Sequence, residues 1–463
     1  MQIWSDQTGS SQRNSNNREK MSLSKFKLKQ SGRVVYYDVD NNTLINDAGE
    51  TVSLPAEKPL EFYEEAKKTH GTRKKHNKPV ALRILFGHAC NYSCDYCMQK
   101  DIGNPDERSK NTALDKFIES IDTYLDLENL ERIELWGGEP FLYWNDIQPV
   151  MKHLDGPKRH FFISTNGSPL RQKHVDFFQS LSAVVNIGIS HDGPGQFIRG
   201  DDIFDKESVA GAIKAIDALY PKVQYSFNCV ISKQNYDLFA INNWFKVVSD
   251  RLELKFPSLS FTLGRTYDET DSQNSTNHVM TGDDTLEFKK IINRYLDARI
   301  EQLHKLGKGK NFPLMESNLF DSRTGAVQYG LSMRNQIPVT MTTNCGADAG
   351  DVLSIDVQGN VRLCPHTNEK YIAGTINNLK GIRIVQLDLN RKKTHCADCN
   401  VRRLCKSSCP IEFPDEVFLK NCRNEKVYYG AVQNAALKLL FGEDVELVET
   451  GIQDAKDIQS QPA

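Results

Sequence analysis

Ten of the eleven cysteines in this sequence fall into two groups with short, regular spacings. The first group is a C-x3-C-x2-C run at 90–97, and the second holds seven cysteines between 345 and 422. Residues 1–20 are polar and lack the apolar stretch of a secretory signal, so we expect a cytoplasmic chain with reduced thiols. Clustered thiols in such a chain more often bind metal or carry out redox chemistry than form disulfides.

The first group suits an iron–sulfur cluster with one open position. Cys90, Cys94 and Cys97 can hold three irons of a [4Fe–4S] cube and leave the fourth iron free for a small molecule. Zinc binds thiolates equally well, but it normally closes its shell with four ligands. The odd count favours the cluster, and a zinc site completed by His88 is the alternative.

The sequence around this loop alternates between strand and helix patterns from about residue 80. Helical periodicity is clearest at 112–125, and a longer helix is predicted at 284–305. Apolar, β-branched runs predict six strands, at 81–86, 132–136, 160–164, 184–190, 223–231 and 258–264. This order predicts an α/β fold of parallel βαβ units, and the pattern alone does not decide between an open sheet and a partial barrel.

Polar or glycine-containing segments follow four of these strands. They are WGGEP at 136–140, STNG at 164–167, SHDGP at 190–194 and NCVI at 228–231. Parallel α/β sheets bind their ligands at the carboxyl ends of the strands. Glycines permit close approach of the backbone to a ligand, and Glu139 and nearby carbonyls can accept hydrogen bonds from an ammonium group.

Together with the three-cysteine loop, these segments resemble the motifs of the radical S-adenosylmethionine (SAM) superfamily over about residues 80–265. The resemblance implies a partial (β/α)6 barrel and a cluster that reductively cleaves SAM to methionine and a 5′-deoxyadenosyl radical. It implies that the 136–140 segment meets the amino group of SAM, and that Arg199 lies near its carboxylate. The implied SAM-binding residues are Tyr96, Gly137, Gly138, Glu139, Pro140, Ser164, Asn166, Ser190, Asp192, Arg199 and Val230.

The second cysteine group resembles the SPASM domain, which carries two auxiliary [4Fe–4S] clusters in radical SAM enzymes that modify peptides or proteins. The spacing is C-x13-G-x4-C from residue 345, followed by C-x2-C-x5-C-x3-C-x12-C from residue 396. The resemblance implies two ligand sets, which are Cys396, Cys399, Cys405 and Cys422 for one cluster and Cys345, Cys364 and Cys409 for the other. A zinc ribbon at Cys396 and Cys399 is the alternative.

The second ligand set has three cysteines instead of four. Some SPASM domains place a further cysteine about six residues before the position of Cys345, and this chain has Val339 there. The fourth iron is then open, or it binds a substrate thiol or a polar group such as Asp348. Cys229 lies inside a predicted strand, and we interpret it as a core residue.

Composition along the chain predicts its division into parts. The N-terminal residues are rich in Ser, Asn, Gln and Arg, which predicts disorder, and a last apolar helix is predicted at 426–441. The predicted order is a disordered tail (1–24), a small β unit with a basic linker (25–79), the barrel (80–305), a linker (306–342), the SPASM domain with its C-terminal helix (343–442) and a flexible acidic tail (443–463).

These features predict an enzyme that abstracts hydrogen from a ribosomally synthesised peptide and forms an intramolecular crosslink, a thioether or a carbon–carbon bond. A flavodoxin- or ferredoxin-type electron donor is the expected partner, and no residue is assigned as acid or base.

Several other functions remain open. The runner-up is an anaerobic sulfatase-maturating enzyme, although that family usually has an aspartate after the cysteine matching Cys364, where this chain has Pro365 and His366. A peptide epimerase, a quinone-cofactor maturase and, from another class, a non-catalytic iron–sulfur electron carrier are the further alternatives.

The overall composition argues against two further classes of protein. The 58 basic and 60 acidic residues give a formal net charge of −2, so no basic excess points to nucleic acid as a partner. No run of about 18 apolar residues occurs, so no membrane span is predicted.

Overall fold

The computed structural model of the chain describes most of the predicted elements. The described residues are 20–39, 42–52, 74–99, 102, 114–265, 278–306, 345–347, 349–367, 369–382, 396, 399–405 and 415–454. Nearly all of the predicted linker 306–342, part of the basic linker, and Val339, Asp348 and Cys409 lie outside them.

A nine-stranded sheet forms the centre of the molecule, in the order β12-β11-β10-β4-β5-β6-β7-β8-β9. Strands β4 to β9 run parallel to one another, which confirms the predicted parallel α/β fold. They are β4 (Ala81–Leu85), β5 (Arg132–Trp136), β6 (His160–Thr165), β7 (Val184–Ser190), β8 (Val223–Ile231) and β9 (Leu259–Leu263). All six match predicted strands, because long apolar runs between helical patterns are a clear sequence signal.

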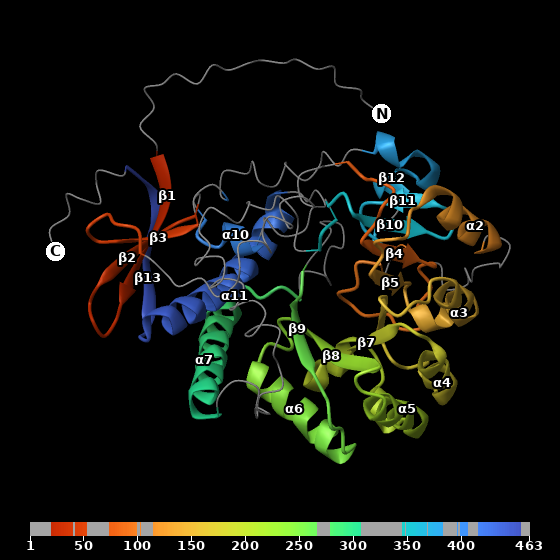
Figure 1. Cartoon of the computed structure of the whole chain (residues 1–463). Coiled ribbons are helices and arrows are strands. Elements are labelled where there is room, and N and C mark those ends of the chain that lie inside the picture. The colour runs from red at the N-terminus through yellow and green to blue at the C-terminus, as the bar shows by residue number, and fades with distance from the viewer. Residues whose placement is uncertain are drawn as a thin grey trace.

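Helices cover the outer face of these strands (Figure 1). They are α2 (Leu114–Tyr124), α3 (Trp144–His153), α4 (Gln172–Ser180), α5 (Glu207–Ala218) and α6 (Leu238–Arg251), with the short 3-10 turns η2 (Pro140–Tyr143), η3 (Gly193–Ile198) and η4 (Ile203–Asp205) near the strand ends. The start of α6 is fixed locally, because the carboxylate of Asp237 accepts hydrogen bonds from the backbone N–H groups of Phe239 and Ala240 at 3.0 and 3.1 Å.

The C-terminal cysteine-rich region continues the same sheet. Strand β10 (Val352–Asp356) pairs in parallel with β4, and β11 (Asn360–Arg362) and β12 (Ile372–Thr375) follow antiparallel. The turns η8 (Glu369–Tyr371) and η9 (Ile376–Gly381) flank β12, and the short helix α10 (Arg402–Cys405) ends at Cys405 of the second cysteine group. The region after residue 343 therefore shares a sheet with the barrel strands.

A second, four-stranded antiparallel sheet joins the two ends of the chain. It contains β1 (Lys20–Leu28), β2 (Val34–Asp38), β3 (Thr43–Asn46) and β13 (Val445–Asp454), in the order β13-β1-β2-β3. The prediction of a flexible tail was therefore wrong for residues 445–454, and the predicted disorder of 1–24 was wrong for 20–24. Each of these segments obtains its backbone hydrogen bonds from the other, and a local sequence pattern does not reveal so distant a partner.

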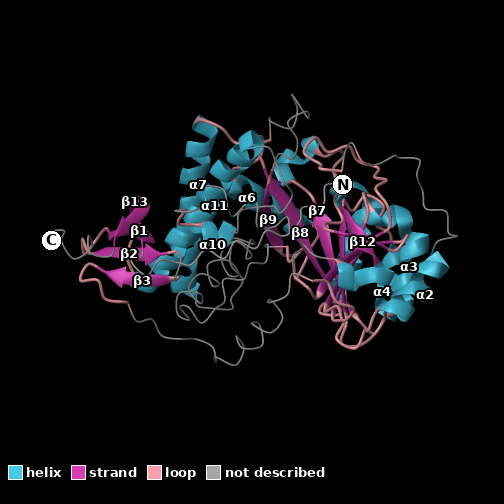
Figure 2. Cartoon of the chain, turned by 90° about the horizontal axis from the view of Figure 1, so that it is seen from above, coloured by secondary structure: helices cyan, strands magenta, loops and turns pink. Residues whose placement is uncertain are grey.

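Two long helices lie between the two sheets (Figures 1 and 2). They are α7 (Asp283–Leu306) and α11 (Asp415–Phe441), and Lys438 Nζ of α11 lies 2.7 Å from the Asp297 carboxylate of α7. One hydrophobic core includes Phe26 of β1, Phe261 of β9, Tyr295 of α7 and Val432 of α11. Helix α11 begins eleven residues before the predicted helix, because its first turns carry Cys422 and polar side chains that interrupt the apolar stripe.

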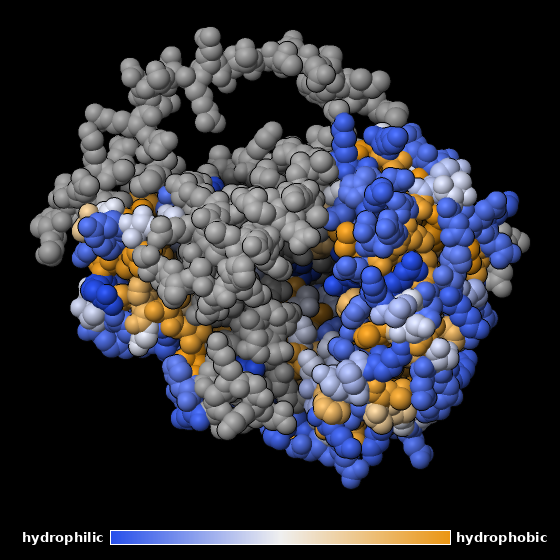
Figure 3. Space-filling model, viewed as in Figure 1, coloured by the Kyte–Doolittle hydropathy of each residue, from blue (hydrophilic) through white to orange (hydrophobic). Residues whose placement is uncertain are grey.

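The surface of the barrel half, at the right of Figure 3, mixes hydrophilic and hydrophobic residues. Among the described helices, none is both long enough and apolar enough to cross a membrane.

Candidate functional site

A cavity of about 410 Å³ lies at the carboxyl ends of the parallel strands, and we call it the reaction cavity. It brings together residues from all the segments singled out in the sequence except 228–231. The predicted residues that line it are Cys90, Cys94, Tyr96, Cys97, Gly137, Gly138, Ser164, Asn166, Ser190, Arg199, Cys345 and Cys364. The other predicted SAM-binding residues, Glu139, Pro140, Asp192 and Val230, are not among its lining residues.

The glycine segment is pressed against the start of the cysteine loop. Backbone N–H groups of Gly138 and Glu139 donate to the carbonyls of Gly87 and Ala89 at 3.0 and 2.9 Å. A Cβ atom at Gly138 would collide with the carbonyl oxygens of His88 and Ala89, so only glycine fits there. The two segments therefore have a fixed relation to one another at the cavity wall.

Glu139 lies behind this wall and ties two segments together. Its carboxylate accepts hydrogen bonds from Phe141 N at 3.0 Å, Thr165 Oγ1 at 2.7 Å and Asn166 N at 2.7 Å. Burial raises the pKa of Glu139 to about 7, although these hydrogen bonds oppose the shift. The side chain acts on the backbone of the site, so the part of this segment that faces a ligand is the Gly137–Gly138 backbone.

Asn166 links the third strand end to the cysteine loop. Its Nδ2 donates to Asn91 Oδ1 at 2.9 Å and lies 3.9 Å from Cys90 Sγ. Its Oδ1 accepts from the backbone N–H and the hydroxyl of Ser168 at 2.9 and 2.7 Å. Both the nitrogen and the oxygen of the Asn166 amide are therefore hydrogen-bonded, and Asn166 holds the loop that carries Cys90.

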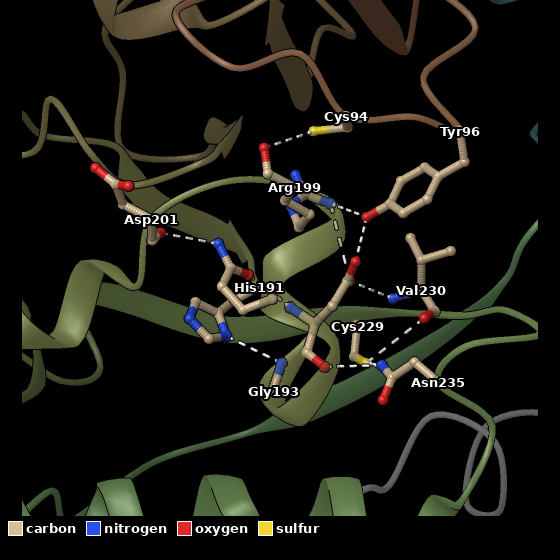
Figure 4. Close-up of polar contacts among 11 residues, drawn as sticks. Cys94, Tyr96, His191, Gly193, Arg199, Asp201, Cys229, Val230 and Asn235 are labelled. Carbon is tan, nitrogen blue, oxygen red and sulfur yellow. Dashed lines mark hydrogen bonds and ion pairs between the residues drawn. The ribbon is translucent and has the colours of Figure 1, made fainter. Parts of the chain in front are cut away.

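Arg199 and Tyr96, which face one another in Figure 4, form a polar cluster with the buried Asp192. Arg199 Nη1 donates to Tyr96 Oη at 2.6 Å, the Tyr96 hydroxyl donates to the Asp192 carboxylate, and Val230 N donates to Asp192 Oδ1 at 2.9 Å. Burial disfavours the charge of Arg199, but Tyr96, Asp192 and Cys94 outweigh burial and raise its pKa. Arg199 Nε is buried without a hydrogen-bond partner among the described residues, which suits an anionic ligand.

Two other reactive side chains near this cluster are structural. His191 is fully buried, accepts from Gly193 N at 3.0 Å and stacks on Trp244 with ring centroids 4.7 Å apart. Cys229 is fully buried within the core, and its thiol lies 3.4 Å from Asn235 Nδ2. The interpretation of Cys229 as a core residue is confirmed.

The cysteines of the second group separate into two places. Cys396, Cys399, Cys405 and Cys422 line one small pocket of about 20 Å³ beneath α11, which we call the four-cysteine pocket. Burial, together with the nearby Cys399 and Cys396, raises the pKa of Cys422 to about 11. Cys345 and Cys364 instead face the reaction cavity.

Both thiol sets fit iron–sulfur clusters by their donor chemistry. Among the described residues, no three His, Cys, Asp or Glu side chains converge as the ligands of a single metal ion would. A cube spreads its thiolates over several irons, so it accepts ligands that line a wall rather than surround a point. The described cysteines are all free thiols, as metal ligands must be.

The structure also places residues in the cavity wall that the sequence analysis did not predict as ligands. His366 packs edge-on against Trp136 with ring centroids 4.5 Å apart, and burial lowers its pKa to about 4. Gln99 Nε2 lies 3.3 Å from His88 Nδ1 and donates to Pro365 O at 3.4 Å, which joins the two cysteine loops. Arg265 lies two residues after β9. Parallel sheets bind ligands at the carboxyl ends of their strands, so this position could have been predicted from the sequence.

A larger cavity of about 880 Å³ lies against strands β5 to β8 and shares Trp136 and Ser164 with the reaction cavity. It is lined by polar side chains such as Glu134, Asn186 and Asn228, and it contains no cysteine. We place the chemistry in the smaller cavity, because the thiols and the glycine segment lie there.

Comparison with known proteins agrees with this arrangement. Residues 84–237 match the family model of the radical SAM superfamily. The chain is 27% identical over 224 residues to the radical SAM cyclopropyl synthase TigE of Paramaledivibacter caminithermalis, covering 43% of this chain and 47% of TigE. It is 27% identical over 156 residues to the GTP 3′,8-cyclase of Actinobacillus succinogenes, covering 33% of this chain and 45% of the cyclase. The chain thus spans about half the length of these two relatives.

Solved structures show the same fold at lower identity. Histidine-tagged anSMEcpe with bound AdoMet has a TM-score of 0.54 and 16% identity, covering 79% of this chain and 99% of that one. Native anSMEcpe with bound AdoMet and the Cp18Cys peptide has a TM-score of 0.52 and 17% identity, covering 78% of this chain and 99% of that one. The fold, the matching family model and the strand-end segments agree, so the chain contains a radical SAM domain over residues 84–237.

Proposed function

We propose that this chain is a radical SAM enzyme that abstracts hydrogen from a ribosomally synthesised peptide and forms an intramolecular thioether or carbon–carbon crosslink. One observation carries the proposal: the three-cysteine loop, the glycine segment and Arg199 line the same cavity as Cys345 and Cys364. A cavity with thiols from both groups suits a substrate held between a SAM site and an auxiliary cluster.

The residues of the first site have different roles in binding the cluster and SAM. Cys90, Cys94 and Cys97 would hold a [4Fe–4S] cluster, which together with SAM supplies one-electron cleavage of a carbon–sulfur bond. The Gly137–Gly138 backbone permits close approach of SAM, and Arg199, fixed by Tyr96, attracts its carboxylate. Asn166 and Glu139 hold the cysteine loop and the strand-end segments in fixed positions relative to one another.

The residues of the second group would hold two auxiliary clusters. Cys396, Cys399, Cys405 and Cys422 would hold one of them, away from the reaction cavity. Cys345 and Cys364 would hold the other together with Cys409, and its fourth position would be open or filled by a substrate thiol, since a thiolate binds iron strongly. A substrate cysteine bound there would be fixed relative to SAM, which favours hydrogen abstraction.

A peptide is the substrate class that a solved structure of similar fold favours. The anSMEcpe structure of similar fold carries the Cp18Cys peptide, and we carry a peptide substrate over to this chain on that basis. Formylglycine formation, as in anaerobic sulfatase maturation, is the second candidate function. The observation that favours it is His366, a side chain in the cavity wall two residues after Cys364, near where that family has its aspartate.

Anaerobic reconstitution, SAM and a reductant test the proposal. We expect about twelve irons per chain, from three cubes, and formation of 5′-deoxyadenosine. A non-catalytic electron carrier would give cluster absorbance without 5′-deoxyadenosine. A flavodoxin- or ferredoxin-type protein is the expected reductant in the cell.

Mass spectrometry of a precursor peptide co-expressed with the chain identifies the reaction. Loss of two hydrogens supports crosslinking. An unchanged mass with one solvent deuterium incorporated would indicate epimerisation, and an aldehyde at a cysteine or serine would indicate formylglycine formation.

A further inference from the structure

An ion pair between Arg265 and Glu425 spans the wall between the reaction cavity and the four-cysteine pocket. Arg265 lines the reaction cavity, and Glu425 lines the four-cysteine pocket. Arg265 Nε donates to Glu425 Oε1 at 2.7 Å, and Arg265 Nη2 lies 2.6 Å from the same oxygen. The two sites are therefore joined by charged groups in direct contact.

Glu425 is placed to act on the thiols of its pocket. It lies three residues after Cys422 on α11, so the two side chains share one face of the helix. The side chain of Glu425 is only 2% exposed, which leaves its charge poorly screened by water. Among the described residues that line the pocket, Glu425 is the sole carboxylate, next to the cationic Arg402 and Lys426.

Arg265 is placed to offset that charge from the other side. Its side chain is 25% exposed, and its guanidinium contacts one carboxylate oxygen of Glu425 through both Nε and Nη2. Arg265 and Arg199 are the cationic side chains among the described residues of the reaction cavity, and no described carboxylate lines it. Arg199 is engaged by Tyr96, so of these two cations it is Arg265 that contacts the carboxylate of the four-cysteine pocket.

We propose that Glu425 and Arg265 together set the reduction potential of the cluster at Cys396, Cys399, Cys405 and Cys422. The proposal rests on the auxiliary cluster named under the proposed function. A buried negative charge beside a cluster disfavours uptake of an electron and lowers its potential, and a positive charge raises it. Glu425 and Arg265 are positioning residues here, because they act through the cluster and touch no reacting atom.

Redox titration of the reconstituted holoenzyme, followed by electron paramagnetic resonance, tests the proposal. Dithionite supplies the single electron that each cluster takes up. The signal that disappears in Cys422→Ala is assigned to the four-cysteine cluster. We expect Glu425→Gln to shift its potential upward, Arg265→Gln to shift it downward, and the double variant to return close to wild type because the two charges cancel.

Two further variants separate charge from folding. Arg265→Lys keeps the positive charge and should leave the potential near wild type even if Arg265→Gln loses iron. Glu253→Gln is the matched control, because Glu253 is an exposed carboxylate that pairs with Lys214 at 3.5 Å on the surface. It should not shift the potential.

Shifts of the same sign in Glu425→Gln and Arg265→Gln, or no shift in either, would overturn the proposal. So would the absence of any signal that depends on Cys422. The potential shifts are measured without SAM or peptide, so they leave the proposed function to its own test, whereas the absence of a Cys422-dependent signal would also count against the auxiliary cluster of that function.

Discussion

The two thiol sites of this chain differ in how they are closed. The three-cysteine loop opens into a cavity of about 410 Å³ whose other walls are glycine backbone, Ser, Asn and Arg. The four-cysteine pocket measures about 20 Å³ and is closed by apolar side chains such as Val401 and Phe418. An open site with three thiols leaves a position for an exchangeable ligand, whereas a closed site with four suits electron transfer alone.

The two sites also differ in what holds them. Backbone contacts and buried polar side chains, such as Glu139 and Asn166, fix the three-cysteine loop against neighbouring strand ends. The four-cysteine pocket is assembled from separate pieces of chain, with Cys422 supplied by α11. The first site is therefore predicted to survive loss of the second, and the predictions below test that separation.

The largest expected effect follows from removing the open site. Replacing Cys90, Cys94 and Cys97 together by Ala should abolish formation of 5′-deoxyadenosine, because no thiolate remains to hold the cluster beside SAM. Iron should fall from about twelve to about eight per chain, since the auxiliary cysteines are untouched. Chromatography of SAM products and iron analysis measure both. Residual 5′-deoxyadenosine would show that SAM is cleaved elsewhere.

The second prediction removes one ligand of the closed site. Cys422→Ala should lose about four irons per chain, because a cube with three of its four thiolates and an apolar surround is unstable. Cleavage of SAM in the absence of peptide should stay near the wild-type rate, while peptide modification is lost. If the rate of SAM cleavage falls in parallel with the iron content, the two sites depend on one another, and the prediction that the first site survives loss of the second is wrong.

A smaller effect is expected from Glu139→Gln. The amide offers one acceptor oxygen to three donors, so at least one buried donor loses its partner, at a cost of about 1–3 kcal/mol. We expect a lower free energy of unfolding and weaker SAM binding, with the four-cysteine cluster intact. Urea denaturation and equilibrium dialysis with SAM measure the two changes, and Glu253→Gln, at an exposed carboxylate that pairs with Lys214 on the surface, is the control.

The pH dependence of this variant gives a second readout. Burial raises the pKa of Glu139 from 4.5 to about 7 in the folded protein, so the folded state binds the proton more tightly than the unfolded state. Wild-type stability should then fall, relative to Glu139→Gln, as pH rises from about 4.5 to about 7. A gap between the two proteins that stays constant over this range would show that the carboxyl group does not titrate there.

Sequence reasoning was strongest where the signal is local. Each parallel strand is rich in apolar and β-branched residues, and a functional segment lies at or just after its carboxyl end, as Gly137 and Gly138 follow β5. The prediction therefore found seven of the residues other than cysteine that line the reaction cavity. It placed Glu139 against a ligand, whereas the structure turns that carboxylate toward the protein.

Sequence reasoning was weakest where distant segments meet. The pairing of β10 with β4 and of β13 with β1 joins parts of the chain that no local period connects. Arg83 Nη2 of β4 donates to the carbonyl of Cys345 at 2.5 Å, and Lys75 Nζ donates to the carbonyls of Ala347 and Ala349 at 2.9 and 2.7 Å. These contacts position the Cys345 loop beside the reaction cavity, and they depend on tertiary structure alone.

The smallest expected effect belongs to Cys229, the cysteine outside both groups. Its thiol is fully buried in β8 and contacts Asn235 Nδ2 at 3.4 Å, so Cys229→Ala removes one buried sulfur and a weak hydrogen bond. We expect a loss of about 1 kcal/mol in the free energy of unfolding, typical of a small core truncation. Iron content and 5′-deoxyadenosine formation should match the wild type, and Cys94→Ala, on the open loop, is the matched control. Loss of iron in Cys229→Ala would make this thiol a ligand and break the division of the cysteines into an open and a closed site.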